Sequence, residues 1–337
     1  MSLQPVKSTE AACETPAARA RSLAKSGILS RGLGQQGGLL IALIVLAVLL
    51  SIIAPRFLTF NNILNVLRQV SMTAIIAVGM TMVITAAEID LSVGSLVSFT
   101  GVFLAWLNID HGIPLPLAFI TAILAGTLVG AFIGFIRTNL NIPAFIITLG
   151  LYTALRSGAY VICDGFPIAP FEASYNWLGG GFIGPIPVPV VIMFVIYALG
   201  YIAFNHTSWG RSIHAVGGNE EASRLSGINT KAIKMSVFML TSTLAAFAGT
   251  ILASRLDSGT PTVAVGWELE VIAAVIIGGT SLYGGRGNLI GTLLGALFVA
   301  LLGNGMILIG ISPYMQGVVS GSVILLAVIV SAPRRRR

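Results

Sequence analysis

The chain has 337 residues, of which 55% are hydrophobic and only 9% are charged, with a formal net charge of +7. A soluble domain carries roughly a quarter charged residues, and no water-soluble fold of this length can bury so much apolar surface. The composition therefore excludes a soluble globular protein and indicates that the lipid bilayer surrounds most of the chain.

The first 37 residues form a basic segment in front of the apolar part of the chain. They hold five lysine and arginine residues and no apolar run that could build a core. We expect a disordered cytoplasmic tail over 1–37 and a transmembrane domain over 38–332. The apolar stretch begins late and no cleavage-like site follows it, so we expect an uncleaved first span rather than a signal peptide.

Runs without Asp, Glu, Lys or Arg predict where the chain crosses the membrane, because a helical crossing needs about 20 mostly apolar residues. The longest run, 287–333, has room for two crossings. The eighth predicted span is the weakest, since Glu268 and Glu270 lie at its start. The prediction is an all-α integral membrane protein with about ten transmembrane helices, at 38–54, 70–87, 91–108, 114–136, 142–163, 188–204, 235–254, 268–283, 288–309 and 313–332.

The basic residues predict which ends of the spans face the cytoplasm, where lysine and arginine collect. With both termini inside, 15 of the 19 lysine and arginine residues fall in cytoplasmic segments, and only Arg56, Arg68 and Arg255 fall outside. The remaining one, Arg156, lies inside the fifth span, where we expect its long side chain to reach the outer surface; a functional role is the alternative. The net charge therefore indicates orientation and contact with membrane lipid, and argues against nucleic-acid binding.

Acidic residues are scarce in the predicted spans. Glu88 and Asp90 are the best candidates for ion coupling, which usually places a carboxylate near the membrane midplane. The predicted topology puts both at a turn, where Asp90 is most simply the N-cap of the third span. Proton coupling stays open as the alternative.

Three polar side chains within the spans are candidates for a translocation path. They are Thr81, Thr85 and Asn304. Each could equally bond to the backbone of its own helix.

Two predicted spans carry glycines at four-residue intervals, a spacing that lines one helix face and lets another backbone approach closely. Each group belongs to the third span of a four-span block, spans 2–5 and spans 7–10, and the blocks would cross the membrane in opposite directions. We therefore predict two inverted four-helix repeats, with tight packing and no duplication as the alternative. The glycines expected at helix contacts are Gly126, Gly130, Gly134, Gly287, Gly291 and Gly295.

The long cytoplasmic connection 205–234 contains a short helix with both ends marked. Asn219 can accept hydrogen bonds from the first free amides, and Glu220 and Glu221 then lie in the first turn, where the helix dipole favours negative charge. A helix of about seven residues is not stable alone, because roughly 12 to 15 are needed. We expect the 219–226 helix to bind a cytoplasmic partner through Asn219, Glu220, Glu221, Ala222, Arg224 and Leu225, with a solvated or lipid-surface helix as the alternative.

The chain lacks the residue patterns of an enzyme. It has no Gly-xxxx-Gly-Lys-Ser/Thr for nucleotide phosphates and no His-Glu-x-x-His or similar set at metal-ligand spacing. We therefore predict no catalytic residue, no metal and no cofactor in this chain. Energy for transport would then come from a separate ATPase that contacts the 219–226 helix.

Several segments together resemble a known family. They are 79–81 with 88–95, 142–150, 215–229, 252–258 and 278–281. They closely resemble the ribose-type permease subunits of bacterial ABC sugar importers, within the branched-chain amino acid/ribose-type family of binding-protein-dependent permeases. The likeness covers roughly 40–332, and it is specific for the family but not for the sugar.

The resemblance implies a permease subunit that moves a monosaccharide or related polyol through the bacterial inner membrane. It implies three partners: a second permease subunit, either a copy or a paralogue; a cytoplasmic ATPase that binds ATP and Mg²⁺; and a periplasmic sugar-binding protein. It also implies that the 219–226 helix is the coupling helix. An ion-coupled secondary carrier or a channel that works without an ATPase is the alternative.

Overall fold

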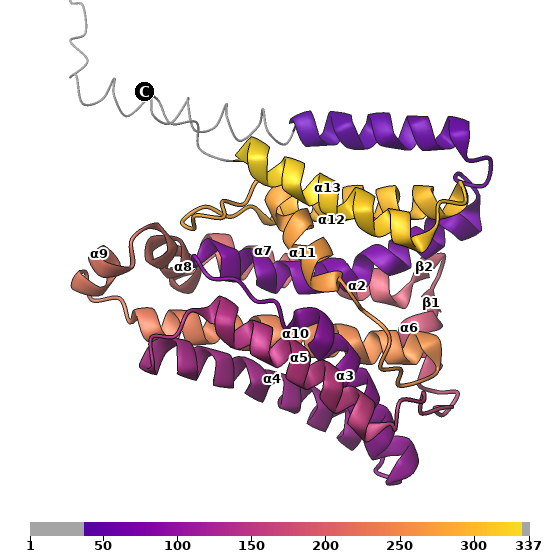
Figure 1. The fold of residues 1–337 in the computed structure, drawn as a ribbon, viewed down its shortest axis with the longest axis horizontal. Coiled ribbons are helices and arrows are strands. Elements are labelled where there is room, and N and C mark those ends of the chain that lie inside the picture. The colour runs from indigo at the N-terminus through magenta and orange to yellow at the C-terminus, as the bar shows by residue number, and fades with distance from the viewer. Residues whose placement is uncertain (1–36, 332–337) are drawn as a thin grey trace, which may run out of the picture.

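The computed structural model describes residues 37–331, and these are mostly helical (Figure 1). The first helix is Gly37–Ile53; the rest of the predicted tail and the four C-terminal arginines lie outside the described residues. The described strands, β1 (Phe182–Ile183) and β2 (Ile186–Pro187), pair as an antiparallel hairpin. The other elements are α2 (Phe60–Thr85), α3 (Val93–Ala105), the π-helix η1 (Trp106–Asp110), α4 (Leu115–Asn139), α5 (Ala144–Ile162), α6 (Asn176–Gly180), α7 (Val188–His206), α8 (Ser208–Gly218), α9 (Glu220–Leu225), α10 (Thr230–Leu256), α11 (Trp267–Ile277), α12 (Leu289–Leu308) and α13 (Pro313–Ser331).

Seven helices in the described part of the chain are long and apolar enough to cross a membrane. They are α2, α3 together with η1, α4, α5, α7, α10 and α12. The chain is therefore an all-α, multi-pass membrane protein, as predicted. The first and last predicted spans also coincide with helices, Gly37–Ile53 and α13.

The eighth predicted span, 268–283, is wrong in its second half. Helix α11 has 11 residues and ends at Ile277. At about 1.5 Å per residue it extends only about half of the roughly 30 Å hydrocarbon layer. The chain continues as a loop, 278–288, in which Gly279, Gly284 and Gly285 have positive φ angles that other residues rarely adopt. This run of glycines explains why the helix stops.

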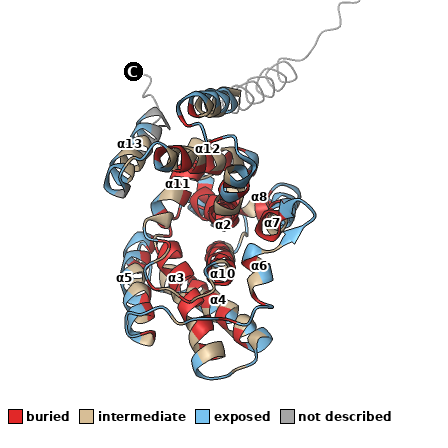
Figure 2. Ribbon diagram, turned by 90° about the vertical axis from the view of Figure 1, so that its right-hand side faces the viewer, coloured by how far each residue is buried: buried red, intermediate tan, exposed pale blue. Residues whose placement is uncertain are grey.

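Two groups of helices meet at the centre of the bundle: α2–α5, which we call the first block, and α10–α13, which we call the second block (Figure 2). The central helices are α2 and α10, which pack against each other. Helix α2 also packs on α11 and α12, and α10 packs on α3 and α4 in the same manner. Helix α5 contacts α3, and helix α13 contacts α11. Only 17% of the apolar stretch of α5 is buried, against 83% for α2, so α5 lies at the periphery.

Two non-helical segments lie inside the bundle, one before each of the short helices α3 and α11. We call 86–92 the first break and 257–266 the second break. Helices α3 and α11 begin side by side, since a side chain at Gly94 would meet the carboxylate of Glu268 and the carbonyl of Ala264. Non-helical backbone at membrane depth is tolerated where protein surrounds it. The buried Asp90 and Ala264 in the breaks agree with this rule.

Asp90 does not cap α3, so that prediction is wrong. The N-cap position is Ser92, whose side chain makes no capping bond. Asp90 Oδ1 accepts hydrogen bonds from the Ser92 amide at 2.8 Å and from the Ser92 hydroxyl at 2.6 Å. The carboxylate therefore stabilises a local turn over Asp90–Ser92, directly before α3 starts.

The first glycine group lies where α4 crosses α10. A side-chain carbon at Gly130 would be 2.5 Å from the carbonyl oxygen of Phe238, and one at Gly134 would be 2.7 Å from Met235 Cα. Gly126 faces Ala246 in the same contact. Only glycine allows the two backbones to approach this closely.

The second glycine group has different surroundings. Gly291 and Gly295 lie on α12; Gly291 faces the backbone of Gly278, directly after α11, and Gly295 faces that of Ala274 in α11. Gly287 precedes α12, which begins at Leu289, and faces Thr85 and Phe204. The two groups are thus similar in spacing but do not pack against corresponding helices.

Candidate functional site

The short helix α9 has the capped structure that the sequence predicts. Asn219 Oδ1 accepts a hydrogen bond from the Ala222 amide at 2.9 Å, and Glu220 and Glu221 lie in the first turn. Gly227 follows with a φ angle of 85°. The capping prediction is therefore confirmed. Helix α9 projects at one end of the bundle, which we call the α9 end, while β1 and β2 lie at the opposite, hairpin end (Figure 1).

The outer surface of α9 has no covering element among the described residues. Leu225 is 78% exposed, and Ala222 is also exposed. Arg224 forms two hydrogen bonds with the Glu221 carboxylate, at 2.7 and 3.1 Å. These bonds and the charge of Arg224 hold the pKa of Glu221 below its ordinary value. The helix thus presents an apolar leucine beside an organised pair of charges.

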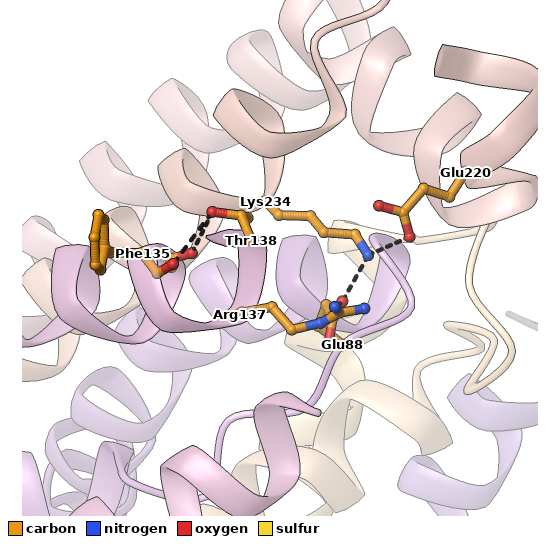
Figure 3. A network of polar contacts seen from close by, with 7 residues as sticks. Glu88, Phe135, Arg137, Thr138, Glu220 and Lys234 are labelled. Carbon is orange, nitrogen blue, oxygen red and sulfur yellow. Dashed lines mark hydrogen bonds and ion pairs between the residues drawn. The ribbon is translucent and has the colours of Figure 1, made fainter. Parts of the chain in front are cut away.

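The inner side of α9 connects to a chain of ion pairs whose central members, Lys234 and Glu88, are buried (Figure 3). Lys234 Nζ on α10 lies 2.6 Å from Glu220 Oε2 and 2.7 Å from Glu88 Oε1 in the first break. Arg137 Nε, at the end of α4, lies 2.8 Å from the same Glu88 oxygen. The side chains of Lys234 and Glu88 are only 4% and 6% exposed. The pairs therefore join α9, α10, α4 and the first break.

Charges that are buried and paired resist separation, because removing one partner leaves the other without compensation. Lys234 supplies the positive charge that lies between the two carboxylates, while Arg137 supplies a second cation to Glu88. If α9 is displaced, Glu220 either separates from Lys234, which is costly, or draws Lys234 along with it. The arrangement can therefore transmit movement of α9 to the first break.

A second set of contacts at the α9 end involves the loop 278–288. The Gly285 amide donates to the Thr85 carbonyl at 2.8 Å, and His214 Nδ1 on α8 lies 3.2 Å from the Gly285 carbonyl oxygen. Gly217 on α8 packs directly against the Thr85 carbonyl. Helix α8, the loop and the end of α2 thus form one layer beneath α9.

Sequence reasoning identified α9 but missed the ion pairs. Glu88 and Lys234 are far apart in the chain, and nothing in the spacing indicates that they touch. One signal was present: the predicted topology places Glu88, Arg137 and Lys234 at the same membrane surface. An acid and two bases at that surface, each flanking an apolar span, could have been paired by charge.

Comparison with known proteins identifies the family of this chain. The family described as "Branched-chain amino acid transport system / permease component" matches residues 62–328. The chain belongs to this permease family. The permease is 45% identical to the ribose import permease protein RbsC of Haemophilus influenzae over 86% of its own length and 90% of that protein. No solved structure matches it.

Other relatives carry related names. The permease is 40% identical to the ribose import permease protein RbsC of Bacillus subtilis, with 89% of this chain and 93% of that protein covered. It is 34% identical to the xylose transport system permease protein XylH of Escherichia coli, with 83% of this chain and 87% of that protein covered. The resemblance drawn from the sequence motifs is therefore confirmed.

The candidate path residues are buried and take part in helix packing within the permease. The Thr81 hydroxyl donates to the Ala77 carbonyl of its own helix at 2.7 Å and lies 2.9 Å from the Thr292 hydroxyl of α12. The Thr85 hydroxyl donates to the Thr81 carbonyl at 2.6 Å. Asn304 exchanges two side-chain hydrogen bonds with Asn62, at 2.9 and 3.0 Å. In this conformation their hydrogen-bonding groups are directed to the protein.

Arg156 does not direct its guanidinium to the membrane surface, which corrects the expectation from the sequence. It donates to the carbonyls of Pro261 at 2.9 Å and Val263 at 2.7 Å. The Ser98 hydroxyl donates to the same Pro261 carbonyl at 2.8 Å. Arg156 thus holds the second break from α5, because carbonyls outside a helix at membrane depth need donors.

Proposed function

We propose that this permease is the membrane-spanning subunit of an ABC importer that moves a monosaccharide or related polyol into a bacterial cell across the inner membrane. The names of its relatives, ribose and xylose permeases, support the substrate class. The single observation that carries the mechanism is α9, a capped helix with an exposed Leu225. We assign no catalytic residue, metal or cofactor to this chain.

We propose ten membrane-associated spans arranged as two inverted repeats, α2–α5 and α10–α13, with both termini in the cytoplasm. The paired contacts support this arrangement, since α2 packs on α11 and α12 as α10 packs on α3 and α4. A hydrogen bond joins Thr81 of α2 to Thr292 of α12, and another joins Thr243 of α10 to Thr127 of α4. The lysine and arginine distribution supports the orientation, which places the α9 end in the cytoplasm and the hairpin end outside.

Helix α9 is the proposed docking element for a cytoplasmic ATPase that binds ATP and Mg²⁺. A movement of the ATPase would shift α9, and the Glu220, Lys234 and Glu88 contacts would carry the shift to the first break. The first break precedes α3, and α3 and α11 begin together, so both short helices would respond. Broken helices of this kind form the substrate region in many transporters.

The proposal requires two further partners besides membrane lipid. A second permease subunit, a copy or a paralogue, would complete the pathway, and a periplasmic sugar-binding protein would deliver the sugar at the hairpin end. The exposed apolar faces of α4 and α5 are available for the lipid or for the second subunit.

An ion-coupled carrier or a channel without an ATPase is the alternative function. Asp90 favours it most, because it is fully buried and its Oδ2 accepts no hydrogen bond from the described residues. Glu88 favours it least, because two cations already pair with its carboxylate. Sugar flux in liposomes that contain the permease alone, driven by a proton gradient, would support this alternative and contradict the importer.

A substitution on the outer surface of α9 tests the docking. Leu225→Arg changes an exposed side chain that no described contact needs, so the variant should insert and fold normally. We expect it to lose co-purification of the cognate ATPase and at least about 90% of ATP-driven sugar uptake, since charged side chains are poorly accommodated in the core of an interface. Leu225→Met is the matched control and should keep both. Normal uptake by Leu225→Arg would contradict the docking assignment.

A further inference from the structure

A cavity opens between the helices of the second block and α2. It has a volume of about 330 Å³ and is lined by α2, the second break, α11, α12 and α13. Among its lining residues, Gln69 lies in the N-terminal half of α2 and Gln316 lies in the first turn of α13. Gln69 follows Arg68, which donates to the Gly180 carbonyl beside β1 at 3.3 Å. The cavity therefore lies toward the hairpin end.

Polar side chains from three helices line this cavity. They are Gln69 and Thr73 from α2, Glu270 from α11, and Gln316 and Ser320 from α13. The Gln316 amide donates to the Ile311 carbonyl at 3.0 Å, which leaves its oxygen free to accept. Among the described residues, the side chains of Gln69, Glu270 and Ser320 have no hydrogen-bond partner. All three residues are half-buried, so their polar groups are accessible to a ligand or water in the cavity.

Small residues provide the space. Alanines 273, 274, 296 and 300 and glycines 266, 303, 317 and 321 line much of the wall. A side-chain carbon at Gly303, Gly317 or Gly321 would meet nothing within 4 Å, so these glycines leave open space. The volume is at the lower end of the roughly 300–1,000 Å³ typical of small-molecule sites. The cavity thus suits a compact ligand.

We propose that this cavity is an entry site for a neutral sugar or polyol on its way through the permease. The inference rests on the proposed import function, and it adds the residues that would hold the substrate. A carboxylate, two amides and two hydroxyls offer both donors and acceptors to a ring of hydroxyl groups. The apolar wall of alanine and leucine would contact the CH groups of the ring. An anion would be repelled by Glu270, and an acyl chain would leave the polar groups unsatisfied.

The site also has a direct connection to the second break. Val265 and Gly266 belong to the break and line the cavity. Glu268, the second residue of α11, is buried beside Gly94 at the start of α3. A movement that separates α3 from α11 would therefore change the inner wall of the cavity. Direct contacts thus connect the entry site to the second break, and Glu268 and Gly94 connect the second break to the start of α3, which follows the first break.

Thiol labelling tests the site on the full importer. Ser320→Cys is made in a chain whose Cys13 and Cys163 are replaced by alanine, with Glu172→Cys at an exposed position of the hairpin end as control. The reagent is a methanethiosulfonate ethylammonium, and the competitor is whichever of D-ribose, D-xylose, D-glucose and myo-inositol the wild-type importer takes up best. We expect modification at both positions and slowing by the sugar only at Ser320→Cys.

Uptake by the same importer gives a second readout. Glu270→Gln should lower sugar uptake about tenfold, the equivalent of one charged hydrogen bond, while Glu172→Gln should stay within about twofold of wild type. ATPase co-purification should be unchanged in both. Absence of labelling at Ser320→Cys, labelling that the sugar does not slow, or normal uptake by Glu270→Gln would overturn the site and leave the import function intact. Absence of uptake of every sugar by the wild type would overturn the import function itself, and this site with it.

Discussion

The two breaks occupy corresponding places in the two helix blocks but are held by different chemistry. The first break is held by charge, through Glu88 and its contacts with Lys234 and Arg137. The second break is held by hydrogen bonds to its backbone groups: Arg156 donates to its carbonyls, and Ile168 pairs with Gly259 at 2.9 and 3.0 Å. The ion pairs of the first break lead to α9, whereas the bonds of the second break remain within the bundle. Under the proposed function, a partner that binds α9 would therefore act first on the first break.

The largest effect is expected from removing the central cation of the first break. Lys234→Met leaves the half-exposed Glu220 without its cation and the buried Glu88 with only Arg137. We expect a cost of about 3 kcal/mol, at the lower end of the range for a buried ion-pair partner, because Arg137 still compensates Glu88. We expect a lower unfolding temperature in detergent and faster hydrogen exchange at 86–92. Lys231→Met, an exposed lysine one turn earlier on α10, is the control and should change neither. An unchanged unfolding temperature for Lys234→Met would contradict the claim that the ion pairs of Lys234 stabilise the first break.

A smaller effect is expected at the second break. Arg156→Met leaves the Val263 carbonyl without this donor and the Pro261 carbonyl with only the Ser98 hydroxyl, at a cost of about 1–3 kcal/mol. Hydrogen exchange should increase over 257–266 and stay unchanged over 86–92, the reverse of the Lys234→Met pattern. Arg56→Met, at an exposed position, is the matched control. If both breaks responded equally to both substitutions, they would not be independent regions.

The smallest effect concerns the bonds that relate the two blocks. Thr127→Val and Thr292→Val each remove one threonine pair between blocks, and interhelical hydrogen bonds in membranes are worth about 0.6 kcal/mol. Double-mutant cycles with Thr243→Val and Thr81→Val should give similar coupling energies. Thr121→Val, whose hydroxyl bonds to its own helix at Leu117, should give no interhelical coupling. Unequal coupling energies would argue that the blocks are not structurally equivalent at this level.

Much of the fold could be predicted from composition, because apolar runs separated by charge mark helices whatever their packing. The capped α9 could be predicted as well, since Asn219 and Gly227 act on their immediate neighbours. The early end of α11 was missed, because the run without charged residues continues past Ile277 to residue 285 and the predicted span followed that run to 283. The role of Asp90 was mistaken because a cap and a local turn use the same residue type.

The ion pairs and the cavity depend on long-range packing, which local patterns do not contain. Lys234 reaches Glu88 only because α10 crosses α2, and Glu270 meets Gln69 and Gln316 at one cavity only because α11 is short. Arg156 was expected at the surface because its partners, the carbonyls of the second break, come from a segment about a hundred residues later. The functional proposals depend on these residues, and their contacts could be identified only from the structure.

Cross-linking from α9 tests the central claim most directly. In a chain whose native cysteines are replaced by alanine, Leu225→Cys at the α9 end is compared with Phe166→Cys at the hairpin end; both native side chains are highly exposed. With a bifunctional thiol reagent in membranes that contain the complete importer, we predict an adduct between Leu225→Cys and the ATPase, and none from Phe166→Cys. An adduct only from Phe166→Cys, or none with the ATPase from Leu225→Cys, would contradict the coupling role of α9.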